Sequence, residues 1–456
     1  MTQFEYDLVT IGAGGGAYPA AFQLARAGRS TLMVDQKGVM SGNCLAEGCV
    51  PSKAIREAAD IERSALAMPY FEQSVHANYR AVVAWKDSVQ LLRYRQHDEE
   101  LAALDDRLKL VSGVATLIDE HTVAFETEYQ TQTVTTENIL IASGSDISIP
   151  PIKGVEHAIT SRDLFAVDPT IQDLPSDLIV IGGGYIGLEV ASMMTILGSR
   201  VTVLEADSQL LPGMDPDFVQ LVVENLDPRI RIELGAQVVE IDQQHRVTYT
   251  QAHQQRHADG EQVLLATGRH PVVPTGASEL GLLDDVEHLW VGPGGTTKID
   301  SIWAAGDATG SQMLFHAATR ESLAVAHNIL AHKIVDRVNP NAVPSTIFTF
   351  PEAAFVGTAR ADLRAAGVES FEVFAPFSHE ARGQLLNDAV GEVRLFGDSH
   401  TNRLLGAWVV GREAGQLIGE LATAILLGAT LADLASVADQ HPLAHEAISR
   451  AARTVV

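Results

Sequence analysis

Two segments of the chain repeat one layout, and this repeat limits the possible folds more than any other feature. An apolar run leads into the glycine-rich turn Gly12–Ala17, and a second apolar run leads into Gly182–Gly187. Each turn is followed by a helical pattern, another apolar run and an acid, Asp35 or Glu205, 23 positions after the first glycine. Strand, glycine turn, helix, strand and acid in this order are typical of a dinucleotide-binding βαβ unit. We therefore expect an α/β protein with two Rossmann-like domains.

The residue types at these turns fit the binding of a pyrophosphate. The first glycine makes the tight turn, the second lets the backbone approach the phosphates, and the third lets the helix pack on the strand. The helix N-terminus favours the phosphate charge, and the acid accepts hydrogen bonds from ribose hydroxyls. Ala17 stands at the third position of the first copy, which the pattern tolerates. Two ordinary glycine turns are the alternative interpretation. The expected binding residues are Gly12, Gly14, Gly15 and Asp35 in the first copy, and Gly182, Gly184, Gly187 and Glu205 in the second.

The second copy favours NAD over NADP. Its acid, Glu205, would repel a 2′-phosphate, which needs a nearby cation. The sequence contains no Arg between positions 201 and 228.

Further elements follow from apolar patterning. We expect strands at 108–117, 122–125, 133–141, 263–268 and 302–306, and a long polar helix at 85–107. From residue 339 the composition changes, which predicts a separate α+β domain. Its expected strands and helices are at 393–396, 407–410, 413–427 and 431–437.

The sequence contains two cysteines, Cys44 and Cys49, which are separated by four residues and followed by a helical pattern. A helix N-terminus lowers the pKa of a thiol and favours the reactive thiolate. The pair therefore suits a disulfide that opens and closes. A structural disulfide and two inert buried thiols are the alternatives. No further Cys could complete a zinc site, so no metal is expected.

Charge and hydropathy exclude several kinds of partner. Asp and Glu number 58 against 32 Lys and Arg, a net charge of −26, which argues against nucleic acid and against an anionic membrane surface. Residues 178–198 are nearly uncharged, but clustered glycines and the central Glu189 make a membrane helix a poor interpretation. The N-terminus shows no targeting signal, so we expect a cytoplasmic protein, where a paired Cys is more often redox-active than structural.

Several motifs together resemble one family, the flavoprotein disulfide reductases, which include dihydrolipoamide dehydrogenase, glutathione reductase and mercuric reductase. The resemblance runs nearly end to end. The motifs that carry it are Gly12–Tyr18, Cys44–Lys53, Ala142–Gly144, Gly182–Glu189, Ala266–Arg269, Ala304–Asp307, Met313–Ala317, Phe348–Glu352 and His441-Pro442 with Glu446.

The resemblance implies FAD in the first fingerprint and NAD in the second. It places Asp307 on the flavin's ribityl chain, pairs Lys53 with Glu189 beside the flavin ring, and makes Tyr185 a shield of the nicotinamide pocket. Other implied contacts are Gly144, His316 and Ala317 for FAD and Gly268 for NAD. The implied domains are an FAD-binding domain in two parts (1–146 and 276–338), an NAD-binding domain (147–275) and a dimerisation domain (339–456).

The resemblance also implies a base near the C-terminus. Thiol–disulfide exchange needs a group that takes and returns a proton, and imidazole does so near neutral pH. His441 is expected to reach the cysteines of a second chain, with Glu446 orienting it, so a homodimer is implied. His445 is a nearby competitor without a carboxylate at the matching offset, and an ordinary surface histidine is the alternative.

The number of cysteines excludes several subgroups of this family. Mercuric reductases and high-molecular-weight thioredoxin reductases use an extra C-terminal Cys pair, and coenzyme A disulfide reductases use a single Cys, so neither pattern fits. Glutathione-type reductases prefer NADP. The resemblance then favours the dihydrolipoamide dehydrogenases, in which protein-bound dihydrolipoyl groups reduce NAD through a redox disulfide, here Cys44–Cys49, and FAD.

Some positions depart from the family pattern GGTCLNVGCVPSK, namely Ser41, Asn43, Ala46 and Glu47, and Leu443 and His445 near the base. The Glu47 carboxylate would raise the thiol pKa values if it faced the cysteines. Because of these changes, the sequence does not determine the substrate. A lipoyl group on a stand-alone carrier protein agrees with the sequence as well as one in a multienzyme complex. The alternatives are a reductase of another low-molecular-weight disulfide and an acidic docking subunit for a basic partner domain.

Overall fold

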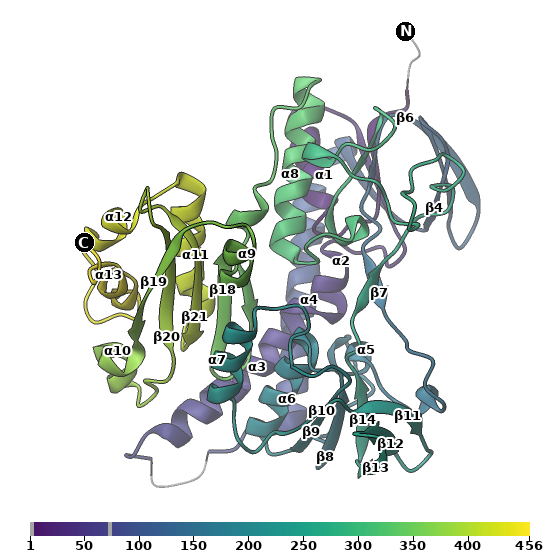
Figure 1. The fold of residues 1–456 in the computed structure, drawn as a ribbon. Helices are drawn as coiled ribbons and strands as arrows, with labels where there is room; N and C mark the ends of the chain where they lie inside the picture. The colour runs from purple at the N-terminus through teal and green to yellow at the C-terminus, as the bar shows by residue number, and fades with distance from the viewer. Residues whose placement is uncertain (1–3, 72–74) are drawn as a thin grey trace.

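Both repeat units form parallel sheets in the computed structural model, which describes residues 4–71 and 75–456 (Figure 1). The parallel strands of the first sheet run in the order β3-β2-β1-β6-β16, and those of the second in the order β10-β9-β8-β14. Each order reverses beside its first strand, which is where open α/β sheets bind ligands. The strands are β1 (Tyr6–Ile11), β2 (Thr31–Asp35), β3 (Leu108–Ser112), β6 (Thr131–Ile141), β16 (Ile302–Ala304), β8 (Asp177–Ile181), β9 (Arg200–Glu205), β10 (Arg231–Leu234) and β14 (Gln262–Leu265).

The two glycine turns take the same backbone conformation. Gly12 has φ +106°, and a Cβ there would lie 2.2 Å from the carbonyl oxygen of Ala142. Gly182 has φ +110°, and a Cβ there would lie 2.3 Å from the oxygen of Ala266. Only glycine fits a positive φ with so close an approach to the neighbouring strand end. The helices that follow are α1 (Tyr18–Arg26) and α6 (Tyr185–Leu197).

Two expectations about elements were wrong. Residues 108–117 form two strands, β3 and β4 (Val114–Asp119), which are separated at Gly113. A Cβ at Gly113 would lie 2.7 Å from the oxygen of Glu126, so the chain turns there to start an antiparallel extension. That extension continues with β5 (Thr122–Glu126) and β6. The long polar helix, α4 (Tyr79–Ala102), begins earlier than residue 85, because the Asn78 side chain accepts a hydrogen bond from Ala81 N–H and caps it.

The C-terminal part is a five-stranded antiparallel sheet in the order β17-β18-β21-β20-β19, with helices packed on it. The predicted strands at 393–396 and 407–410 and the helices at 413–427 and 431–437 are present. The strands are β17 (Ser345–Ile347), β18 (Glu352–Gly357), β19 (Ser370–Pro376), β20 (Glu392–Asp398) and β21 (Leu404–Gly411), and the helices are α9 (Arg360–Ala365), α10 (Ala381–Leu385), α11 (Ala414–Leu427), α12 (Leu431–Ala435) and α13 (Glu446–Ala452).

The remaining elements join these parts. A three-stranded sheet contacts the second parallel sheet, and β7 pairs with β15 in a separate two-stranded ribbon. They are β11 (Gln237–Ile241), β12 (Arg246–Gln251) and β13 (Gln254–Asp259), and β7 (Ser145–Ile147) with β15 (Arg269–Pro271). The other helices are α2 (Gly42–Glu47), α3 (Cys49–Ala67), α5 (Ser161–Phe165), α7 (Pro216–Asn225) and α8 (Phe315–Ala331).

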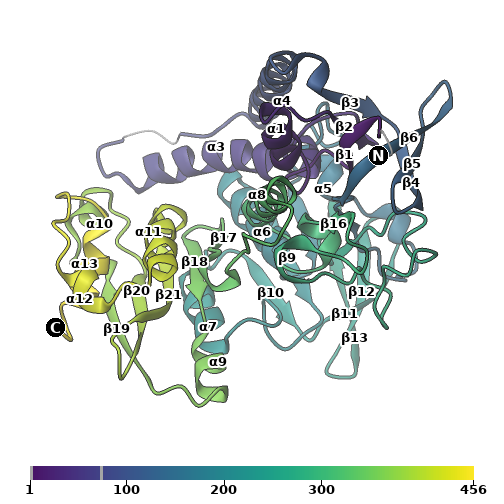
Figure 2. The same ribbon diagram turned by 90° about the horizontal axis from the view of Figure 1, so that it is seen from above.

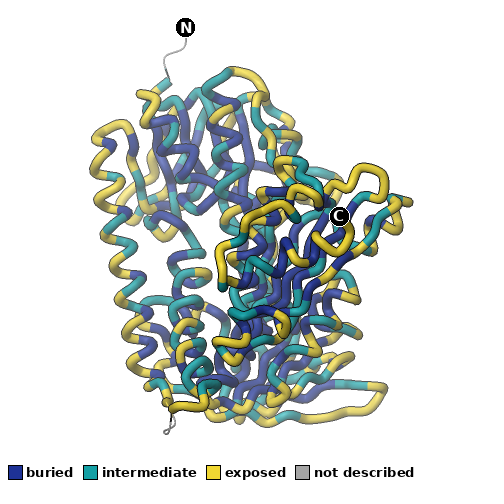
Figure 3. The backbone as a smooth tube through the Cα atoms, turned by 90° about the vertical axis from the view of Figure 1, so that its left-hand side faces the viewer, coloured by how far each residue is buried: buried dark blue, intermediate teal, exposed yellow. Residues whose placement is uncertain are grey.

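Helix α3 connects the first sheet to the C-terminal sheet. It extends towards α10 in the view from above (Figure 2), and Arg63 on it pairs with Asp388 at 2.7 Å. Phe218 of α7 packs on Trp408 of β21 at 5.5 Å between ring centres. Buried residues concentrate along the strands, and exposed ones on outer helix faces and turns (Figure 3). Within residues 4–71 and 75–456, none of the helices has the length and apolar character that a membrane crossing requires.

Candidate active site

One cavity of about 1770 Å³ is lined by residues of both glycine turns, both acids and both cysteines. It brings together nearly all of the cofactor-binding residues expected from the sequence. Those that line it are Gly12, Gly14, Gly15, Asp35, Lys53, Gly144, Asp307, His316, Gly182, Gly184, Tyr185, Glu205 and Gly268. Two expected residues are outside the described lining. Ala317 is buried within α8, and Gly187 packs its α-carbon against the oxygen of Gly182.

The motif glycines in and beside the cavity differ in what surrounds them. A Cβ at Gly187 would lie 2.0 Å from a backbone oxygen, so this glycine serves packing. A Cβ at Gly144, Gly184 or Gly268 would meet no atom within 4 Å. The backbone at these three positions is therefore open to the cavity, as close approach by a dinucleotide requires. The donor set of this cavity fits two dinucleotides.

The two acids occupy equivalent positions. Asp35 Oδ2 accepts a hydrogen bond from Ala13 N–H at 3.0 Å, and Glu205 Oε2 accepts one from Gly183 N–H at 2.6 Å. Each carboxylate thus ties the end of the second strand to the glycine turn. Both residues line the cavity, and a carboxylate has acceptor capacity that suits ribose hydroxyls.

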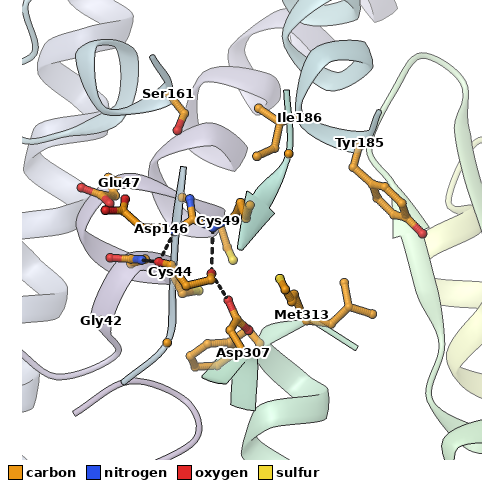
Figure 4. Close-up of a pocket in the computed structure, with 18 of the residues that line it drawn as sticks. Gly42, Cys44, Glu47, Cys49, Asp146, Ser161, Tyr185, Ile186, Asp307 and Met313 are labelled. Atoms are coloured by element: carbon orange, nitrogen blue, oxygen red, sulfur yellow. Dashed lines mark hydrogen bonds between the residues drawn. The ribbon is translucent and has the colours of Figure 1, made fainter. Parts of the chain in front are cut away.

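The cysteines lie at the junction of α2 and α3. Cys44 is in the first turn of α2, and Cys49 is the first residue of α3. A hydrogen bond from Cys44 lowers the pKa of Cys49, and Lys53 lowers it further against the opposing effect of burial. The same hydrogen bond, together with burial, raises the pKa of Cys44. The thiolate of the reduced pair is therefore more stable on Cys49 than on Cys44. Figure 4 shows the two cysteines next to each other in the cavity.

Glu47 does not act on the thiols as a free carboxylate. Its oxygens pair with Lys37 at 2.9 Å and Arg162 at 3.0 Å. The sequence had allowed Glu47 to raise the thiol pKa values, but Glu47 is not among the groups that shift them.

Lys53 and Glu189 form the expected pair. Lys53 Nζ donates to Glu189 Oε2 at 2.7 Å and lies 4.3 Å from the ring centre of Phe348. Glu189 Oε1 accepts a hydrogen bond from Phe348 N–H at 3.1 Å. The pair thus joins α3, α6 and the start of the C-terminal sheet, three parts of the fold that meet at the cavity.

Two residues of the site were missed as site residues, although both adjoin motif glycines. Ser145 donates to Asp307 Oδ2 at 2.5 Å, and Arg269 donates to Ser145 Oγ at 2.9 Å. The Ser145 carbonyl also accepts from Asn43 Nδ2 at 2.9 Å. Ser145 follows Gly144 and Arg269 follows Gly268, so the glycine motifs were the available signal. This cluster fixes the orientation of the Asp307 carboxylate.

Tyr185 lies where α6 approaches β17. Its hydroxyl is hydrogen-bonded with Ser345, and burial raises the pKa of the phenol. His316 Nε2 is hydrogen-bonded with the carbonyl of Pro344 at 2.6 Å. Both side chains line the wall of the cavity nearest the C-terminal sheet.

His441 and Glu446 pair with each other but not with the cysteines of their own chain. Glu446 Oε1 lies 3.1 Å from His441 Nδ1, and the described lining of the cavity includes neither residue. Burial opposes the ionisation of Glu446, but hydrogen bonds from His441 and Leu443 N–H outweigh it and hold the pKa of the carboxyl below its ordinary value. His445 was the other candidate for the base, but its Nε2 accepts a hydrogen bond from Gln440 N–H within the same turn.

Comparisons with known proteins agree with this architecture. A family model described as pyridine nucleotide-disulphide oxidoreductase matches residues 6–322, and the dimerisation domain of the same family matches 343–452. A dihydrolipoyl dehydrogenase of Haloferax volcanii is 34% identical over 99% of this chain and 96% of its own length. A dihydrolipoamide dehydrogenase of Chaetomium thermophilum is 31% identical over 99% and 91%.

A solved structure is similar over the full length. The HOCl-induced flavoprotein disulfide reductase RclA from Escherichia coli, in its Cu(II) complex, matches with a TM-score of 0.87 and 25% identity. The match covers 100% of both chains.

Proposed function

Because the chain belongs to the pyridine nucleotide-disulphide oxidoreductase family, whose members use FAD and NAD(H), we propose that this disulfide oxidoreductase is a dihydrolipoyl dehydrogenase. The observation that supports this most directly is the hydrogen-bonded pair Cys44 and Cys49 in a cavity shared with both glycine turns. The names of the similar full-length proteins support the lipoyl substrate.

Thiol exchange at this pair follows from the chemistry of the two sulfurs. A dihydrolipoyl thiolate attacks Cys44 Sγ in the oxidised pair, and the bond to Cys49 breaks. Cys49 is the better leaving group because its pKa is lowered. The second lipoyl thiol then displaces Cys44 from the mixed disulfide, which forms the lipoyl disulfide and leaves two electrons on the cysteine pair.

Proton transfer accompanies this exchange. His441 of the partner subunit takes the proton of the first attacking lipoyl thiol and releases it to solvent, then takes the proton of the second and passes it to the Cys44 sulfur. Glu446 holds its imidazole in one orientation. FAD, when bound, supplies the transfer of the electron pair to NAD as hydride. Lys53 and Glu189 orient each other at the wall of the cavity where the two cofactors would meet.

The assembly and setting follow from the same proposal. We place FAD binding in 1–146 and 276–338, NAD binding in 147–275 and dimerisation in 339–456. The dimerisation-domain match supports a homodimer. The partner is a lipoyl-bearing carrier protein or domain, and the setting is the cytoplasm.

A second candidate is a reductase of another low-molecular-weight disulfide. The similarity to a solved flavoprotein disulfide reductase and the redox-loop residues Asn43, Ala46 and Glu47 favour it. A panel of NADH and NADPH against lipoamide, glutathione disulfide and related disulfides separates the two. We expect turnover with NADH and lipoamide. Turnover only with another disulfide would contradict the lipoyl assignment.

The choice of nicotinamide cofactor gives a separate prediction. A Glu205→Gln variant keeps an acceptor for Gly183 N–H but removes the charge that repels a 2′-phosphate. We expect the NADH-to-NADPH ratio of kcat/KM to fall about tenfold, which corresponds to about 1.4 kcal/mol. Steady-state kinetics with both cofactors measure it, and Glu240→Gln, which lies in an exposed ion pair, is the control. An unchanged ratio would remove Glu205 from the specificity site.

A further inference from the structure

Helix α2 carries Cys44 but is too short to hold its own orientation. It spans only Gly42–Glu47, and a helix of this length is unstable in water without tertiary contacts. The position of the Cys44 sulfur therefore depends on what holds α2 from outside.

Glu47, the last residue of α2, provides the strongest of these contacts. Its side chain is only 8% exposed and pairs with Lys37 at 2.9 Å and Arg162 at 3.0 Å. Arg162 also pairs with Asp146 at 2.6 Å. A carboxylate this buried is stable only with such partners, so the two cations hold the end of the helix in place. Figure 4 shows Glu47 beside the cysteines and close to Asp146.

Other hydrogen bonds restrain the same helix. Lys37 Nζ also donates to Asn43 Oδ1 at 2.7 Å. Gln90 of α4 is fully buried, and its Nε2 donates to the carbonyls of Leu45 and Ala46 at 2.9 and 3.0 Å. Gln90 thus holds the backbone of α2 and Lys37 holds the Asn43 side chain, whereas Glu47 ties the last turn of the helix to two cations.

The rotation of α2 matters because Cys44 and Glu47 lie three residues apart, on one face of the helix. We propose that Glu47 is a positioning residue whose ion pairs with Lys37 and Arg162 fix the orientation of α2, and with it the position of the Cys44 sulfur relative to Cys49. This inference rests on the proposed function, in which Cys49 is the thiolate of the reduced enzyme.

Positioning and simple charge make opposite predictions for a Glu47 variant. Removing the carboxylate takes a negative charge away from Lys37 and Arg162 near the cysteines, and charge alone would lower the pKa of Cys49. Loss of the hydrogen bond from Cys44 would instead raise it, because that bond is the largest cause of the lowered pKa. The sign of the change therefore tests the proposal.

The experiment follows the long-wavelength thiolate–flavin absorbance of the two-electron-reduced holoenzyme against pH. In Glu47→Val, which introduces the residue of the family pattern, we expect the apparent pKa of Cys49 to rise by about 1. Glu47→Gln keeps an acceptor oxygen and should show a smaller rise. Glu240→Gln, in an exposed ion pair with Lys153, is the control and should leave the pKa unchanged.

A second variant tests the same proposal if the Glu47 variants fail to fold. Arg162 has a side chain that is 44% exposed, so Arg162→Gln should fold, and it should raise the apparent pKa of Cys49 as well. An unchanged or lowered pKa in the variants would overturn the positioning role of Glu47. Absence of the absorbance band from the unmodified enzyme would instead contradict the proposed function.

Discussion

A Cys44→Ser variant should lose turnover with lipoamide by a factor of at least about 10³, while NADH still reduces its flavin. A hydroxyl cannot replace the sulfur that dihydrolipoyl thiolate attacks, so exchange stops at its first step. The residues that line the rest of the cavity, including Glu205 and both glycine turns, are untouched. Steady-state kinetics with lipoamide measure the thiol–disulfide exchange, and stopped-flow kinetics with NADH measure the reduction of the flavin.

Cys49→Ser is the matched control for this variant. Both variants should lose lipoamide turnover, but they should differ in absorbance. In Cys44→Ser the Cys49 sulfur has no disulfide partner and stands as a thiolate without reduction, so the long-wavelength band should be present at rest. Cys49→Ser should lack it. Lipoamide turnover in the Cys44→Ser variant would rule out the proposed exchange.

A His441→Gln variant should lower lipoamide turnover by about 10²- to 10⁴-fold, the usual effect of removing a general base, without changing flavin reduction by NADH. The pairing of Nδ1 with Glu446 leaves Nε2 free to accept a thiol proton. Steady-state lipoamide kinetics and stopped-flow reduction of the flavin by NADH measure the two effects.

The chain offers a close control, His400→Gln. The His400 side chain is 73% exposed against 71% for His441, and it also pairs with a carboxylate, that of Glu369. It should leave turnover unchanged. An equal loss in both variants would assign the effect to the domain rather than to the base.

Mixed dimers test whether the base comes from the partner subunit. When Cys44→Ser chains are combined with His441→Gln chains, each mixed dimer has one complete site if the site is shared between chains. Random pairing should then give about one quarter of the activity of the unmodified enzyme. If His441 acted within its own chain, every site would be defective and no activity would return.

Much of the site could be predicted because its signals are local. The turn at Gly12 and the turn at Gly182 each need a positive φ next to a neighbouring strand, and only glycine meets that need. The acids follow at a distance set by one helix and one strand. Local geometry of this kind leaves a pattern in the sequence wherever the fold occurs.

Other features depend on residues that are distant in the sequence. In the sequence, Glu47 is only a residue of the redox loop that differs from the family pattern. Its partner Arg162 lies 115 positions away, and no motif indicates that the two residues pair. The break at Gly113 was missed because one apolar run serves two strands whose neighbours, β2 and β5, come from different parts of the chain. The pattern of apolar residues in the sequence indicates which residues are buried, but it does not indicate which strands pair with each other.

The path of the chain through the first sheet has a consequence for synthesis on the ribosome. Strand β16 completes that sheet at residues 302–304, after β14 has completed the second parallel sheet at 262–265. The middle domain can therefore finish folding while the N-terminal domain still lacks its last strand, since domains generally fold as units as they emerge. Until then, the edge of β6 that β16 will cover stays open to pairing with other chains, which is a risk of aggregation for the nascent protein.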